Sequence, residues 1–250
     1  MALRTGNPTL SERTFAQWQT TIQEVPQRMS LDGTVHRTFF LLCLVVAAAG
    51  SVWGLIDSNP DLLFPVCIGG SLTGFVLALV TIFKKEWSPY TSPFYAGAEG
   101  LVLGTLSSIF ERAYPGIVLQ AVGLTFGTLF CLLLAYRSGL IKPTENFKLG
   151  VVAATGGIAL VYLVSIGLRF FGTDVPFIHD AGAAGIGFSL FVVVIAALNL
   201  VLDFDFIEQG VEHGAPKYME WYAAFGLVVT LIWLYLEILR LLAKIRSSDR

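Results

Sequence analysis

The 250-residue chain is 55% hydrophobic and only 14% charged, with a mean hydropathy of +0.71. Soluble domains carry about 25% charged residues, so this composition excludes an ordinary water-soluble globular protein and indicates an integral membrane protein. The net charge of −2 excludes a general electrostatic attraction to nucleic acid.

Seven segments of the chain are long and apolar enough to cross a bilayer as helices. A span needs about 20 mostly apolar residues to cross roughly 30 Å of hydrocarbon. The segments that meet this rule are 38–56, 62–83, 92–110, 116–136, 147–170, 182–206 and 219–243. We therefore expect an all-α integral membrane protein, a bundle of seven transmembrane helices over residues 38–243. A basic tail at 244–250 follows it.

Residues 1–37 form the one substantial polar stretch and precede the first predicted span. Apolar side chains recur within it at helical spacing, at Phe15, Trp18, Ile22, Val25 and Met29. Two interpretations are open: a helix that lies in the membrane interface, or a short helix that caps the bundle.

Small residues recur four positions apart in several of the predicted spans. The pairs are Gly50/Gly54, Gly70/Gly74, Gly100/Gly104 and Gly123/Gly127, with Ala183/Gly187 in the sixth span. Such pairs let helix backbones approach closely in lipid. We expect a tightly packed bundle rather than a wide water-filled pore.

Basic residues are distributed unequally between the two sides of the predicted bundle. With the amino terminus in the cytoplasm, ten Lys and Arg residues fall on inner segments, and only Arg112 and Arg169 fall on outer loops. This asymmetry follows the positive-inside rule. The four basic residues in 240–250 follow or end the last span, and an odd number of crossings places them outside. We expect the last span to cross fully.

Acidic residues at membrane depth are the candidate functional residues, because an ionisable group there costs at least a few kcal/mol. Asp203 and Asp205 lie near the inner end of the sixth span, about 200° of rotation apart on a helix. Asn199 lies one turn before Asp203 and shares its face. We expect Asp203 to point into the bundle and Asp205 to reach toward the inner surface. The alternative for either is a plain helix-end acid.

Glu99 lies about two turns into the third span, roughly 10 Å deep and similar in depth to Asp203. Two carboxylates at one depth in a bundle of low dielectric constant can share a proton. Such a pair would sense pH and could hold calcium transiently. The alternative is a neutral Glu99 that is hydrogen-bonded to a neighbouring helix.

Glu237 lies near the outer end of the seventh span, and Arg240 follows three residues later. Side chains at this spacing share one helix face, so the sequence predicts an ion pair between them. Glu237 differs in depth from Asp203 by something like 20 Å, and a direct contact between these two acids is not expected.

The sequence gives no support for catalysis. Intramembrane serine proteolysis needs a serine nucleophile and a basic histidine within the spans, but His36, His179 and His213 fall in loops or at span edges. The GxGD motif of intramembrane aspartyl proteases and the phosphate-binding and dinucleotide fingerprints are absent. We therefore expect neither enzyme activity nor a cofactor.

Four stretches of the chain carry a family resemblance. They are Tyr-Ala-Gly-Ala-Glu-Gly at 95–100, Leu-Asp-Phe-Asp-Phe-Ile at 202–207, Glu-Trp-Tyr-Ala-Ala-Phe-Gly at 220–226 and Trp-Leu-Tyr-Leu-Glu-Ile-Leu-Arg at 233–240. In their order and seven-span setting they resemble the Bax inhibitor-1 family, in its bacterial YccA-like branch. Asn7-Pro8-Thr9-Leu10, followed by Phe15, is similar to long-form bacterial members.

The resemblance implies a bundle in the bacterial cytoplasmic membrane whose last helix is central and wrapped by the other six. It also implies a pH-sensitive calcium leak. In that family two aspartates, one late in the sixth span and one in the seventh, hydrogen-bond to each other as a proton-dependent latch. Asp203 matches the first of them, but the second falls on Thr230, which cannot titrate. Glu99 is our preferred substitute partner for Asp203, and Glu237 is a second carboxylate at another depth.

Two functions from different classes therefore remain. The first is a protein that passes or senses Ca²⁺ and is gated by protonation at Asp203 and Glu99, because carboxylates are both hard ligands for Ca²⁺ and titratable groups. The second is a non-conducting protein that restrains a membrane-anchored quality-control protease, as some bacterial relatives do, through residues 1–37. The partners that we expect are the lipid bilayer and, in the second case, that protease.

Overall fold

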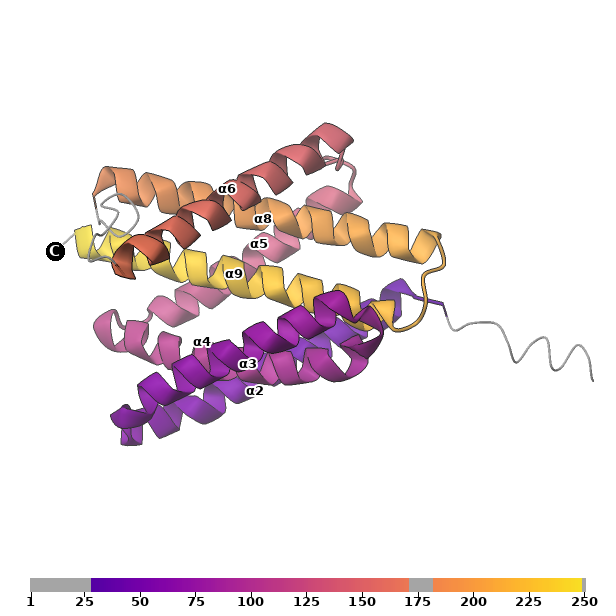
Figure 1. Ribbon diagram of the computed structural model, residues 1–250. Helices are drawn as coiled ribbons and strands as arrows, with labels where there is room; N and C mark the ends of the chain where they lie inside the picture. Colours follow the sequence, from indigo (N-terminus) through magenta and orange to yellow (C-terminus); the bar gives the residue numbers. More distant parts are fainter. Residues whose placement is uncertain (1–27, 171–181, 249–250) are drawn as a thin grey trace, which may run out of the picture.

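The computed structural model describes residues 28–170 and 182–248, and these ranges hold seven long α-helices (Figure 1). The helices are α2 (Leu31–Ser58), α3 (Leu63–Phe83), α4 (Ser88–Ala113), α5 (Ile117–Arg137), α6 (Glu145–Phe170), α8 (Ala183–Glu212) and α9 (Met219–Ser248), with short 3-10 turns η2 (Pro60–Leu62) and η3 (Lys85–Trp87). The shortest of the seven has 21 residues, which is about 32 Å at 1.5 Å per residue and long enough to cross a bilayer.

Six of the seven helices are also apolar enough to cross a membrane, and α4 is the one that is not. The polar residues of α4 lie largely inside the protein, including Ser88, Thr91, Ser92, Thr105 and Ser107. A helix that is covered by its neighbours can carry such residues, because it presents less of its surface to lipid. The expected span at 92–110 therefore corresponds to a helix of spanning length whose hydropathy is lowered by a polar interior face.

The first helix begins earlier than hydropathy predicts, at Leu31 instead of residue 38. Ser30 caps it, since the Ser30 hydroxyl accepts a hydrogen bond from the N–H of Gly33 at 3.1 Å. Part of the segment expected to be a separate polar region is thus the first two turns of α2. The expected interfacial or capping helix runs from Phe15 to Met29; its residues up to 27 lie outside the described ranges, and Arg28 and Met29 precede α2 without being helical.

Only some of the predicted pairs of small residues lie where two helices pack closely. A Cβ on Gly100 of α4 would lie 2.6 Å from the carbonyl oxygen of Val45, and one on Gly104 would collide with the carbonyl oxygen of Ala49. Gly70 and Gly74 of α3 similarly meet side chains of α4. In contrast, no atom lies within 4 Å of a Cβ placed on Gly50, Gly54, Gly123, Gly127 or Gly187. The tight interfaces are therefore α2–α4 and α3–α4.

The last two helices are the most buried of the candidate spans. Half of the most apolar 18-residue window of α9 is buried, as is 44% of that of α8, against 22% or less for the other four. Helix α9 packs against α2, α4, α5 and α8, and Figure 1 shows it running between α2–α4 and α6–α8. The fully buried Leu200, Val228, Leu234 and Leu239 lie on α8 and α9. The core of the protein is therefore organised around these two helices.

Candidate functional site

Asp203 points from α8 toward α9, where it meets Gly226 and Thr230. Its Oδ1 lies 4.0 Å from the position of a Cβ on Gly226, and Thr230, one helical turn further along α9, lies near the carboxyl. The other oxygen, Oδ2, is buried and has no hydrogen-bond partner among the described residues. The contact between α8 and α9 thus contains a carboxyl with one unused oxygen.

Thr230 occupies the position that the resemblance assigns to a second aspartate. Its hydroxyl donates a hydrogen bond to the carbonyl oxygen of Gly226 in its own helix, at 3.2 Å. A hydroxyl has one proton to donate and lone pairs to accept another. Because that proton is donated to Gly226, the Thr230 oxygen can accept from Asp203 when the carboxyl is protonated, but it can donate to an ionised Asp203 only by giving up its bond to Gly226. A pair of this kind responds to protonation although only one member titrates.

Glu99 faces α3 and does not pair with Asp203. Its Oε1 lies 2.5 Å from the position of a Cβ on Gly74, so the carboxyl fills the space that this glycine leaves open. Val102, three residues later and on the same face, fills the space at Gly70. No hydrogen bond or ion pair between Glu99 and Asp203 is found in the described part of the chain. The expected pair is therefore not formed, because the packing of α4 on α3 turns Glu99 toward α3.

A calcium site of several acidic ligands is not assembled at either carboxyl in the described ranges. Within residues 28–170 and 182–248, no three His, Cys, Asp or Glu side chains lie together as a metal site would need. Any calcium bound at Asp203 or Glu99 would therefore meet fewer than three such side chains of the described ranges.

Asp205 and Asn199 point away from the Asp203 carboxyl. Asp205 forms an ion pair with Lys148 at the start of α6, with an N–O distance of 2.8 Å. The Asn199 amide donates to the hydroxyl of Thr155 in α6, also at 2.8 Å. Both side chains thus fasten α8 to α6, whereas Asp203 faces α9.

Glu237 and Arg240 form the expected ion pair, at 2.9 Å. The Tyr162 hydroxyl of α6 donates to Glu237 at 3.0 Å, and Arg240 donates to the same hydroxyl oxygen at 2.8 Å. The Glu237 side chain is only 2% exposed. Its charge is balanced within this group, which joins α9 to α6. Seven residues of helix, about 10 Å, separate Glu237 from Thr230.

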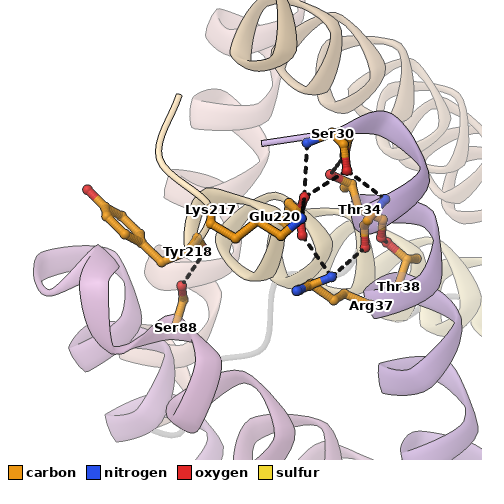
Figure 2. Close-up of polar contacts among 9 residues, drawn as sticks. Ser30, Thr34, Arg37, Thr38, Ser88, Lys217, Tyr218 and Glu220 are labelled. Carbon is orange, nitrogen blue, oxygen red and sulfur yellow. Dashed lines mark hydrogen bonds and ion pairs between the residues drawn. The ribbon is translucent and has the colours of Figure 1, made fainter. Parts of the chain in front are cut away.

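A second buried charge cluster lies at the start of α9 and is centred on Glu220 (Figure 2). Oε1 of the fully buried Glu220 accepts hydrogen bonds from the backbone N–H and the hydroxyl of Ser30, both at 2.9 Å. Arg37 of α2 pairs with Oε2 at 2.7 Å, and Lys217 pairs with Oε1 at 3.0 Å. Two cations and one carboxylate therefore tie the start of α2 to the start of α9.

The fit between α2 and Glu220 depends on Gly33. A Cβ on Gly33 would collide with the Glu220 carboxylate, so only glycine leaves room for this group. The Arg37 guanidinium is held in place by the carbonyl oxygen of Gly33 at 3.1 Å, and it lies over the ring of Trp221, 5.2 Å from the centroid. The cluster is thus a preorganised contact between two helices.

Sequence alone gives little indication of this cluster. An acidic residue in the first turn of a helix is ordinary, and Arg37 and Lys217 look like basic residues flanking spans. The available signal was local: Ser30 in a capping position with Gly33 three residues later. The acid that completes the site is remote in the chain, and no pattern of spacing connects them.

An apolar cavity of about 280 Å³ opens between α2, α4, α5 and α9. Trp53, Phe126 and Leu231 are among its lining residues, and the polar groups there include Ser107 and Tyr235. The hydroxyls of Ser107 and Tyr235 are hydrogen-bonded to each other at 2.6 Å. The cavity therefore offers a hydrated cation few oxygen ligands.

Long apolar helices and buried charge clusters between them define a polytopic helical membrane protein. A family model described as Bax inhibitor 1 like matches residues 7–247. The chain therefore belongs to the Bax inhibitor-1 family, as its sequence pattern predicts. Neither the curated proteins nor the solved structures contain a match to this chain.

Proposed function

We propose that the protein is a pH-sensitive calcium leak whose gate is the contact between Asp203 of α8 and Thr230 of α9. In this proposal all seven long helices cross the bacterial cytoplasmic membrane, the amino terminus is cytoplasmic and α9 is central. The observation that carries the proposal is the buried, unpartnered Oδ2 of Asp203 at the interface between two of the most buried helices.

Protonation of Asp203 changes what this interface can do. A neutral carboxyl supplies a proton that the Thr230 oxygen can accept, which joins α8 to α9. An ionised carboxyl has no proton to give, and its Oδ2 is charged, buried and without a partner among the described residues, which is costly in a low-dielectric interior. It gains a hydrogen bond from Thr230 only if that hydroxyl leaves the Gly226 carbonyl. The packed arrangement therefore suits the neutral form, and ionisation favours an arrangement in which water or a cation reaches Asp203.

Calcium is the proposed permeant ion because the exposed carboxylate would be a hard oxygen ligand. A single carboxylate binds Ca²⁺ weakly, since lasting sites use six to eight oxygen ligands. Weak binding suits conduction, because an ion must leave as readily as it enters.

Calcium flux into liposomes tests this proposal. The purified protein is expected to admit Ca²⁺ at a rate that differs between about pH 6 and about pH 8, a range that a carboxyl reaches where a functional site perturbs its pKa. Asp203→Asn cannot ionise and is expected to lose the pH dependence. Asp205→Asn is the matched control, since Asp205 lies two residues away and pairs with Lys148. The flux of this variant is expected to keep its pH dependence.

Two results would refute the leak. One is the absence of flux at any pH. The other is an Asp203→Asn variant whose flux follows pH as that of the unaltered protein does.

The second candidate is a non-conducting protein that restrains a membrane-anchored quality-control protease. The close backbone approach of α4 to α2 at Gly100 and Gly104, together with the apolar lining of the cavity, favours this reading. Deleting residues 1–27 should then abolish co-purification of the protease. Retained co-purification would argue against a contact through that segment.

A further inference from the structure

The starts of three helices, α2, α4 and α9, meet around Glu220 (Figure 2). Besides the bonds from Ser30, Arg37 and Lys217, the hydroxyl of Ser88 at the start of α4 donates to the carbonyl oxygen of Tyr218 at 3.0 Å (Figure 2). The starts of α2, α4 and α9 are therefore joined at one place, directly after the connection that follows α8.

Residues 28–30 form a strap that leads into this cluster. Arg28 forms an isolated antiparallel bridge with Pro216, and the Met29 N–H donates to the carbonyl oxygen of Ala215 at 2.7 Å. The Met29 side chain is 4% exposed, and its sulfur lies 2.9 Å from the position of a Cβ on Gly210. The strap is thus fastened to the end of α8 and to the connection between α8 and α9.

The contacts of this cluster depend on the single carboxylate of Glu220. Its carboxylate is the acceptor that draws Arg37, Lys217 and Ser30 together. If the carboxylate is displaced, Arg37 and Lys217 remain close together without their shared counter-ion, and Ser30 loses its acceptor. The contact between the start of α2 and the start of α9 therefore depends on the position of the Glu220 carboxylate.

We propose that Glu220, Arg37, Lys217 and the strap form an inner clamp that holds α9 in the position at which Thr230 meets Asp203. Helix α9 is continuous from Met219 to Ser248, and ten residues, about 15 Å of helix, separate Glu220 from Thr230. A shift at the clamp is carried along this helix to the gate. The clamp thereby regulates the gate, and this regulatory role rests on the proposed calcium leak.

A matched pair of glycine variants tests the clamp without changing any charge. Gly33→Ala places a methyl group against the Glu220 carboxylate, whereas Gly54→Ala lies in the same helix with no atom within 4 Å of the new Cβ. Both changes favour helix formation to a similar extent. The difference between them therefore reports the clamp alone.

Hydrogen–deuterium exchange of the full-length protein in lipid nanodiscs provides the first measurement. In Gly33→Ala, the amides of Met29 and Ser30 and those of residues 219–224 should exchange about tenfold faster than in the unaltered protein. Gly54→Ala should match the unaltered protein. Lys217→Gln removes one ion pair from a half-exposed side chain, so it should fold normally and show a smaller increase at the same amides.

Calcium flux in liposomes provides the second measurement, with a rate about fivefold or more higher in Gly33→Ala. Unchanged exchange in both Gly33→Ala and Lys217→Gln would overturn the clamp. Faster exchange with an unchanged flux would overturn its control of the gate. If the unaltered protein shows no flux at any pH, the proposed leak fails, and the exchange at 219–224 still decides whether the clamp holds α9.

Discussion

Glu220 at the start of α9 occupies the space that Gly33 leaves open in the first helical turn of α2. One helix contributes a residue without a side chain, and the other contributes a fully buried carboxylate. The fit fixes where α9 begins relative to α2.

Glu220→Ala is expected to destabilise the protein by about 1–3 kcal/mol, because Ser30 and the partly exposed Arg37 and Lys217 lose the carboxylate that they share. Thermal unfolding in detergent measures the loss. Glu145→Ala is the control, since Glu145 is 91% exposed and pairs with Lys148 at 3.4 Å; its melting temperature should be unchanged. Equal melting temperatures for the two variants would show that the Glu220 cluster adds no stability.

Gly104→Ala is expected to destabilise the bundle by about 1–3 kcal/mol, because the added methyl group collides with the Ala49 carbonyl at the α2–α4 contact. Gly123→Ala has open space around the new Cβ and should be neutral or slightly stabilising. The comparison uses the same thermal measurement. A neutral Gly104→Ala would mean that α2 and α4 are not packed as closely as described.

Tyr162→Phe is expected to cost about 1 kcal/mol of stability, because it removes the hydroxyl that bridges Glu237 and Arg240. The pH dependence of calcium flux should be unchanged in this variant and also in Glu237→Gln. Both residues belong to a balanced group some distance from the gate. A flux that loses its pH dependence in Glu237→Gln would move the sensor to that residue.

The long helices could be predicted because each must present about 20 apolar residues to lipid. The start of α2 could not be predicted in this way, since its first two turns are polar and are held by the Ser30 cap and the Arg37 ion pair. Asp203 was found because a carboxyl at that depth is costly. The direction in which Glu99 points was not predicted, because it depends on the space beside the glycines of α3, which is defined only once α3 and α4 are packed.

The choice of partner for Asp203 illustrates the same limit. Equal depth suggested Glu99, but depth gives no information on which helix a side chain faces. The structure places Thr230 beside Asp203, at the position that the family pattern assigns to the second aspartate. A neutral hydroxyl there makes the contact depend on one titrating group.

The pH dependence of calcium flux in two Thr230 variants tests the gate most directly. Thr230→Ser keeps a hydroxyl and should retain the dependence between about pH 6 and about pH 8. Thr230→Val keeps the shape of the side chain but can neither donate to nor accept from Asp203, so its flux should lose most of the difference between these two pH values. If Thr230→Val follows pH as the unaltered protein does, the contact between Asp203 and Thr230 is not the gate.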